Sequence, residues 1–251
     1  MVFIDAHCHL VTDEFDRDRD KVIERMLAKG VSRAVLICCD EEESRLGAEL
    51  RSRNPGFKLA CGIHPQDLEY DSTDGRLGRF RETVGRLKAD MIGEIGLDYY
   101  SHPHTREAQN RFFRAQLDTA REMGLPVDIH SRKAARDTYD TLKEYSLRGI
   151  IHSYSGSVEM ARLYVKLGYY ISFGASMMFP GARKPAQVIA DMPLDRLLIE
   201  TDAPYQSPVR DHRHEPSDIV NIYEAVCRIR GIGLEELAGR LEQNWNDLFC
   251  S

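Results

Sequence analysis

The chain of 251 residues contains no apolar run that approaches the roughly 20 residues needed to cross a bilayer. Its first residues lack the basic region followed by an apolar one that marks an export signal, so we expect a cytoplasmic protein without membrane attachment. Basic residues are not in excess, because the formal net charge is −6. This balance argues against a broad basic surface that grips long nucleic acid, but it leaves room for a small site in which metal ions hold one phosphate.

Cysteine is sparse and follows no pattern. The six cysteines show no C-x-x-C spacing, and most lie in apolar, strand-like stretches where a free thiol behaves as a small hydrophobic side chain. We therefore expect reduced cysteines in a reducing compartment and no disulfide framework. The cysteines are Cys8, Cys38, Cys39, Cys61, Cys227 and Cys250.

Short apolar runs rich in β-branched residues alternate with amphipathic or charged segments of helical length. Eight strands, each followed by a helix or a connection, predict an α/β protein with a (β/α)8 TIM barrel. No internal repeat, low-complexity tract or linker interrupts the chain, so we expect one domain over residues 1–251. The expected strands are Val2–Ala6, Arg33–Cys38, Lys58–Gly62, Met91–Ile95, Pro126–Ile129, Gly149–Ile151, Tyr169–Phe173 and Arg196–Glu200. The expected helices are Arg17–Lys29, Glu41–Arg53, Arg106–Met123, Arg132–Tyr145, Ser157–Leu167, Ala182–Ala190, Ser217–Arg230 and Leu234–Leu248.

An open, doubly wound sheet would produce a similar alternation of strands and helices. Such a sheet usually carries a glycine-rich phosphate loop after its first strand. In this chain the position holds His7, Cys8 and His9 instead. We therefore favour the barrel.

Histidines and carboxylates recur where the predicted strands end. Side chains alternate along a strand, so His7 and His9 reach one face together with Asp5. A single histidine at a strand end is usually a core or rim residue. Several histidines and carboxylates rarely occur by chance at the same end of several strands. In a parallel barrel this end is where chemistry gathers. The residues at the strand ends are His7, His9, His64, Glu94, His130, His152 and Asp202.

Imidazole together with carboxylate favours zinc, manganese or a similar divalent ion. Six ligands exceed what one tetrahedral catalytic site uses, so we expect two ions. Two cations roughly 4 Å apart share one water, lower its pKa and neutralise an oxyanion, and Asp202 would take the proton of that water. The expected division gives His7, His9 and Asp202 to one ion, His130 and His152 to the other, and Glu94 to both.

Seven segments follow one another in the order typical of one enzyme family: DAHCHL, GIHP, GEIGLDYY, QNRFFRAQLDTAREMGLPVDIHSR, IIHSYSG, LLIETDAPY and HEP. With these segments and a terminal NWNDLF, the chain from Phe3 to Phe249 resembles the TatD family of metal-dependent hydrolases. The family commonly has Arg-Asn-Glu-Pro where this chain has Arg213, His214, Glu215 and Pro216.

The resemblance implies an amidohydrolase-like TIM barrel that hydrolyses nucleic-acid phosphodiesters, often as a 3′→5′ deoxyribonuclease. It implies dependence on a divalent metal, usually magnesium or zinc. Together with the ligand count, this leads us to expect two divalent ions (zinc, magnesium or manganese), a DNA end or single strand as the partner, and no obligate protein partner. Glu94 and Asp202 would be catalytic, and His64 would lie near the substrate phosphate or an additional metal. By matching position, the implied metal ligands are His7, His9, Glu94, His130, His152 and Asp202.

Further residues near the strand ends are candidates for weaker roles. Arg132 follows the strand that carries His130 and could pair with a phosphate, and Asp5 could orient a ligand. Tyr205 and Arg213 lie in the loop after the eighth strand, where barrels often bind phosphate. Three tyrosines could stack on an unpaired base, although rim aromatics more often cover the core. They are Tyr99, Tyr100 and Tyr154.

Two other functions remain open at this point. The same metal site could serve an ester or amide hydrolase, such as a D-aminoacyl-tRNA deacylase, because two metals act on carbonyl and phosphoryl centres alike. Many cyclic-amide hydrolases bridge their metals with a modified lysine on the fourth strand, where this chain has Glu94, and this favours the phosphodiester. A non-catalytic metal-binding barrel is disfavoured because the ligand set and a candidate base are complete.

Overall fold

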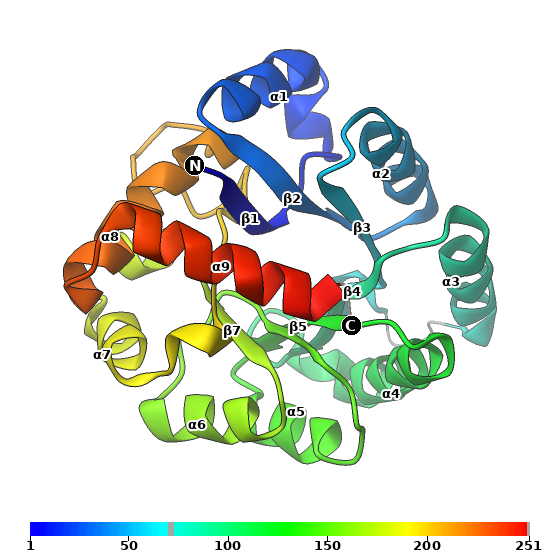
Figure 1. The fold of residues 1–251 in the computed structure, drawn as a ribbon. Coiled ribbons are helices and arrows are strands. Elements are labelled where there is room, and N and C mark those ends of the chain that lie inside the picture. The colour runs from blue at the N-terminus through cyan, green and yellow to red at the C-terminus, as the bar shows by residue number, and fades with distance from the viewer. Residues whose placement is uncertain (70–72, 250–251) are drawn as a thin grey trace.

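Eight parallel strands follow one another around a sheet in chain order, so the predicted (β/α)8 barrel is confirmed (Figure 1). The computed structural model describes residues 1–69 and 73–249. The first and last strands meet at the rim, where the Asp202 N–H donates to the His7 carbonyl at 3.0 Å and the His9 N–H to the Ala203 carbonyl at 2.7 Å. The strands are β1 (Phe3–Cys8), β2 (Val31–Cys38), β3 (Phe57–Cys61), β4 (Met91–Asp98), β5 (Val127–Arg132), β6 (Gly149–Ile151), β7 (Tyr170–Phe173) and β8 (Leu197–Ile199).

Helices surround this sheet, with their apolar faces toward it (Figure 1). Local sequence explains several of their starts: the Asp40 carboxylate accepts from the Glu43 N–H at the start of α2, and the Ser157 hydroxyl accepts from the Met160 N–H at the start of α6. The helices are α1 (Arg19–Ala28), α2 (Glu41–Arg53), α3 (Asp74–Leu87), α4 (Arg106–Met123), α5 (Ala135–Leu142), α6 (Val158–Lys166), α7 (Arg183–Asp191), α8 (Ile219–Arg230) and α9 (Leu234–Phe249).

Two helices differ from the sequence-based expectation. The helix expected over Arg132–Tyr145 begins later, at Ala135, because β5 continues to Arg132, which pairs with Asp98 of β4, and Lys133 takes a left-handed φ of 55°. Helix α3 was not among the expected helices. Its sequence contains three glycines, which weaken the helical signal, and tertiary packing of its apolar side supplies the stability that propensity does not.

The end of the barrel from which β1 starts is closed by α9, which lies across it in Figure 1. Trp245 and Leu248 of this helix are 4% and 0% exposed. They pack in one cluster with apolar side chains from the strands. These include Ile4, Val35, Ala60, Met91, Ile150, Tyr170 and Leu198.

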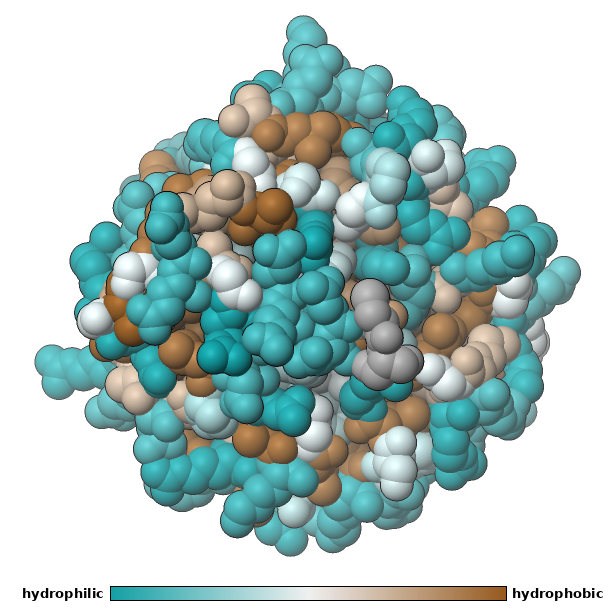
Figure 2. Space-filling view, viewed as in Figure 1, coloured by the Kyte–Doolittle hydropathy of each residue, from teal (hydrophilic) through white to brown (hydrophobic). Residues whose placement is uncertain are grey.

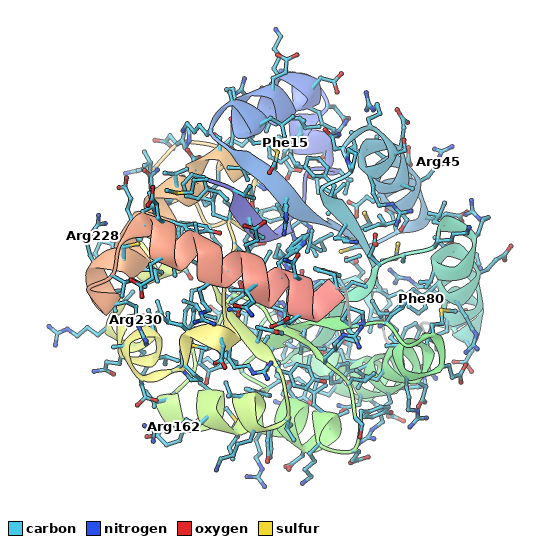
Figure 3. All side chains as sticks on the ribbon, in the orientation of Figure 1. Phe15, Arg45, Phe80, Arg162, Arg228 and Arg230 are labelled. Atoms are coloured by element: carbon cyan, nitrogen blue, oxygen red, sulfur yellow. The ribbon has the colours of Figure 1, made fainter. Side chains whose placement is uncertain are left out.

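The surface on the α9 side is largely hydrophilic, and its apolar patches are small and separated (Figure 2). Figure 3 shows Arg45, Arg162 and Arg228 on the outside of the helical ring, whereas Phe15 and Phe80 lie between helices and sheet and are buried. Within the described ranges, no helix combines the length and apolar character that a membrane crossing requires. Five cysteines of the described chain are free thiols, and Cys250 lies outside the described residues.

Candidate metal centre

The six predicted metal ligands converge at the carboxyl end of the barrel, around the Glu94 carboxylate. On one side of the centre, the Nε2 atoms of His7 and His9 lie 3.1 Å apart. Asp202 Oδ1 lies 3.5 Å from the His7 nitrogen and 3.4 Å from the His9 nitrogen. These three residues form the first group predicted from the sequence, and their ligand atoms are close enough to share one ion.

The two oxygens of Glu94 face different imidazoles. Oε2 lies 3.4 Å from His7 Nε2, whereas Oε1 lies 2.6 Å from His130 Nδ1 and 3.4 Å from His152 Nε2. The two oxygens of this carboxylate thus face two separate sets of imidazoles. His64 joins the second side as well, because its Nε2 lies 3.4 Å from Glu94 Oε1. Two further groups of ligand atoms lie close enough to share an ion, one made of His7, Glu94 and His152 and the other of His64, Glu94 and His130. His130 and His152, predicted to share an ion, thus fall into different groups, and Glu94 belongs to both.

Three buried carboxylates that the sequence analysis did not identify orient the imidazoles from behind. Orienting partners of this kind fix the tautomer of a ligating histidine, so that its other nitrogen can bind a cation. The signal for one of them was present in the sequence, since Asp128 stands two positions before His130 on β5, whereas Glu200 and Asp202 both lie after the end of β8. The contacts are Asp128 Oδ1 to His7 Nδ1 at 3.1 Å, Glu200 Oε1 to His152 Nδ1 at 2.9 Å and Asp98 Oδ2 to His130 Nε2 at 3.2 Å.

Two glycines of the GEIGLD segment allow β5 to approach β4 at the metal centre. A Cβ on Gly93 would lie 2.5 Å from the Asp128 Cβ. Gly96 has a φ of +147°, and a Cβ there would lie 2.0 Å from the His130 carbonyl oxygen. Any larger side chain would push away the strand that carries both a ligand and an orienting carboxylate.

The buried carboxylates of the cluster favour positive charge nearby. Burial alone lowers the pKa of His7, but Asp128 and Glu94 raise it well above its usual range. Burial raises the pKa of Glu94, yet the charges of His152, His64 and His7 hold it well below its usual value. Buried carboxylates thus draw positive charge onto the imidazoles. A divalent cation meets the same demand, and nitrogen and oxygen donors of this kind suit it.

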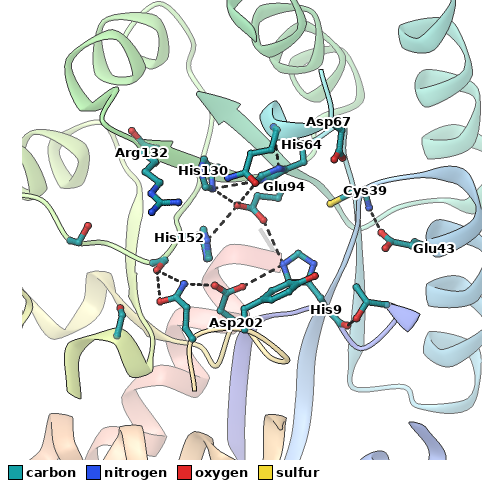
Figure 4. Close-up of a pocket in the computed structure, with 18 of the residues that line it drawn as sticks. His9, Cys39, Glu43, His64, Asp67, Glu94, His130, Arg132, His152 and Asp202 are labelled. Atoms are coloured by element: carbon teal, nitrogen blue, oxygen red, sulfur yellow. Dashed lines mark hydrogen bonds and ion pairs between the residues drawn. The ribbon is translucent and has the colours of Figure 1, made fainter. Parts of the chain in front are cut away.

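The centre opens into a cavity of about 820 Å³ (Figure 4). His64, Arg132 and Tyr205, which the sequence predicts to contact substrate, all line this cavity. The Arg132 guanidinium lies 4.2 Å from the centre of the Tyr100 ring, and Tyr205 is 46% exposed with its ring 5.4 Å from that of His9. Figure 4 shows Arg132 on one side of the cavity, opposite Cys39, Glu43 and Asp67.

Arg213, also expected to contact substrate, does not line this cavity. Its guanidinium donates to both carboxylate oxygens of Asp18 at 2.8 Å and lies over the Phe15 ring. His214, at the position where the resembled family has Asn, is buried and lies with Nδ1 3.0 Å from the Tyr205 carbonyl. This segment therefore braces the loop that carries Tyr205.

The remaining candidates divide by exposure. Tyr154 is buried, and the Tyr99 hydroxyl donates to Asp137, so Tyr100, at 61% exposed, is the freest of the three tyrosines. Asp5 is fully buried, and its carboxylate accepts from the Thr201 N–H and hydroxyl at 2.9 and 2.6 Å. It therefore holds the chain that leads into Asp202 rather than an imidazole ring.

Comparison with known proteins gives one family. A family model described as TatD related DNase matches residues 4–250. An uncharacterized metal-dependent hydrolase, YabD of Bacillus subtilis, is 36% identical over 253 residues, covering 99% of each chain. The human deoxyribonuclease TATDN3 is 30% identical and covers 98% of this chain, which in turn covers 94% of it.

Solved structures agree with the sequence comparison. The crystal structure of YjjV, a TatD homologue from Escherichia coli, superposes with a TM-score of 0.92 at 30% identity over 99% of this chain and 98% of that one. The similarity thus extends over the barrel, its loops and the helices that surround it.

Proposed function

The chain belongs to the TatD family of metal-dependent hydrolases, and we propose that it is a deoxyribonuclease that removes nucleotides in the 3′→5′ direction from single-stranded or frayed DNA. The observation that carries the proposal is the Glu94 carboxylate, whose two oxygens face separate imidazole groups beside Asp202. The name of the human relative supports DNA as the substrate. Many cyclic-amide hydrolases have a modified lysine in this place, so the glutamate favours a phosphodiester over a cyclic amide as the substrate.

Two divalent ions, zinc, magnesium or manganese, would occupy the centre. His7, His9 and Asp202 would hold one, His130 and His152 the other, and Glu94 both. When bound, such a pair supplies an activated water and neutralises charge on the phosphoryl oxygens.

Asp202 is the residue that would accept the proton of the attacking water. The hydrogen bonds from His7 and His9 outweigh the effect of burial and hold its pKa well below the usual range, so the carboxylate is ionised. The Gln206 amide donates to Oδ2 and fixes the direction of the carboxylate. The backbone of Asp202 has a left-handed φ of 59°, a conformation that costs energy and is common at functional positions.

Three residues around the cavity would position the phosphodiester. His64 faces Glu94 from β3's end and could donate to a phosphoryl oxygen. Arg132 has a guanidinium free of carboxylate partners among the described residues, so it could pair with the phosphate that follows the cleaved bond. Tyr205, half exposed beside His9, offers a ring and a hydroxyl to the terminal nucleoside.

The proposal is tested with the purified protein, a single-stranded DNA oligomer labelled at its 5′ end and a chelator. We expect the loaded protein to shorten the oligomer one nucleotide at a time, chelation to stop the reaction, and one of the three metals to restore it. Elemental analysis of the same preparation gives the number of ions per chain. A loaded protein that leaves every DNA intact while it deacylates a D-aminoacyl-tRNA would contradict the proposal.

A further inference from the structure

The amino end of α7 carries an unusual charge. Each of the helices α1 to α6 has an acidic residue in its first turn, but α7 starts with Arg183 and Lys184 and has no acid there. Positive charge at a helix amino terminus opposes the helix dipole and costs stability. Both side chains are exposed, and neither has an ion-pair or hydrogen-bond partner in the described part of the chain.

This helix start belongs to the rim of the candidate metal centre, because it follows the carboxyl end of β7. The connecting turn contains Ser176 and Phe179, which line the cavity, and Phe179 is 39% exposed. The Ala182 N–H donates to the Phe179 carbonyl at 3.0 Å, so the backbone turns at Phe179 and leads directly into Arg183 and Lys184. An aromatic ring beside cations is the combination that binds single-stranded nucleic acid.

Arg132, the last residue of β5, and Lys133, which follows it, extend this side of the rim. Both are exposed, and no carboxylate of the described residues pairs with them. Ser153 and Ser155, after β6, line the cavity between the two loops with neutral hydroxyls. We call Arg132, Lys133, Arg183 and Lys184 the basic edge.

The opposite side of the cavity is acidic. Asp40 and Glu43, after β2, and Asp67, after β3, line it, and Figure 4 shows Glu43 and Asp67 across the cavity from Arg132. Arg76 lines the cavity as well, 3.9 Å from the Asp67 carboxylate, so it offsets one of these three charges and leaves the side acidic. Glu43 is half-buried, and its carboxylate accepts from the Cys39 N–H at 2.6 Å, so its position is fixed. A polyanion is therefore repelled on this side and attracted on the other.

From this asymmetry we propose that the polynucleotide reaches the metal centre across the loops after β5, β6 and β7. Its phosphates lie along the basic edge and one base stacks on Phe179, so only its last nucleotide extends toward the acidic side. The inference rests on the proposed function for the class of substrate, single-stranded nucleic acid. It adds the path of the strand and residues that bind it outside the metal centre.

The test compares R183Q/K184Q with K29Q/K166Q. The control removes the same charge from exposed lysines at the ends of α1 and α6, on the other rim of the barrel. We expect R183Q/K184Q to lower kcat/KM for a 20-nucleotide single strand about tenfold, since two phosphate contacts are lost. Cleavage of a thymidine dinucleotide, which cannot reach α7, stays within twofold of wild type, and the control variant matches wild type on both substrates.

Binding is measured separately with a phosphorothioate 20-mer by fluorescence anisotropy at several salt concentrations. We expect the slope of log affinity against log salt to decrease by about 1.4 in R183Q/K184Q, and F179A to weaken binding about tenfold. Equal losses on the 20-mer and the dinucleotide, an equal loss in the control, or unchanged binding would overturn the inference. If the wild type binds the strand through Arg183 and Lys184 but releases no nucleotide, the proposed function fails and the path of the strand stands.

Discussion

The two ends of the barrel bury different kinds of side chain: charged and polar ones at the carboxyl end, and apolar ones at the amino end. At the carboxyl end His7, Glu94, Asp128 and Asp202 are all at most 7% exposed. At the amino end the buried cluster is apolar, and Trp245 of α9 closes it. Burying polar and charged groups costs free energy unless they are paired, whereas burying an apolar side chain stabilises the fold. The amino end therefore stabilises a barrel whose other end is arranged for chemistry.

The backbone shows the same division. Of the six described residues other than glycine with left-handed φ angles, four lie around the cavity, whereas one ends α3 and one lies in the exposed loop after β8. The four are Lys133, Ser153, Asp202 and Gln206, with φ between 44° and 59°. Residues other than glycine adopt this region at a cost, and such positions cluster at functional sites. Substitutions at the two ends should therefore separate activity from stability.

The largest expected effect is that of Asp202→Asn at the carboxyl end. The change removes a cation ligand and the proton acceptor while it keeps the shape of the side chain, so we expect DNA cleavage to fall by about 10³-fold or more. Because the carboxylate is paired with His7 and His9, the melting temperature of the chelated protein should fall as well, so cleavage is compared per folded molecule at a temperature where both proteins are folded. Cleavage within tenfold of wild type at equal metal content would show that the proton goes elsewhere.

At the amino end, Trp245→Ala should have the opposite profile. Truncating a buried tryptophan leaves a cavity and lowers the free energy of unfolding by about 3–5 kcal/mol. Denaturant titration measures this loss, and cleavage per folded molecule at low temperature should stay within twofold of wild type. Trp245→Phe, which keeps most of the apolar volume, serves as the control. A large loss of cleavage without a loss of stability would contradict the division between the two ends.

Asp128→Asn should give a smaller effect at the carboxyl end. Asp128 touches His7 from behind the candidate metal site, and loss of such an orienting carboxylate costs about 10–100-fold in metal affinity or activity. Competition with a chelator measures the affinity for zinc. Asp140→Asn, the same chemical change on the exposed side of α5, should leave it unchanged. Equal affinities of wild type and Asp128→Asn would show that His7 is oriented by other contacts.

The sequence was sufficient to predict the barrel and the convergence of the strand-end ligands, because both follow from the order of strands. Asp128 shares the face of His130 on β5 by simple alternation, so its role could have been predicted as well. Glu200 lies after β8 and Asp202 has a left-handed φ, so alternation does not extend to this pair. The position of Arg213 could not be predicted, since its partner Asp18 lies 195 positions away in sequence. The three glycines of α3 likewise obscured a helix that is stabilised by tertiary contacts.

Arg213→Gln should have the smallest effect, and it separates the two interpretations of this residue. If its guanidinium mainly braces the loop through Asp18, cleavage stays within twofold of wild type and the free energy of unfolding falls by about 1 kcal/mol or less. The hydrogen bond from Arg213, together with a smaller contribution from Arg25, lowers the pKa of Asp18 from 3.8 to about 2. A lowered carboxyl pKa stabilises the fold above 3.8, so the difference between variant and wild type should be constant near neutral pH and shrink as the pH falls from 3.8 toward 2. A tenfold rise in KM for DNA with stability unchanged would instead assign Arg213 to the phosphate, as its place in the loop after β8 first indicated.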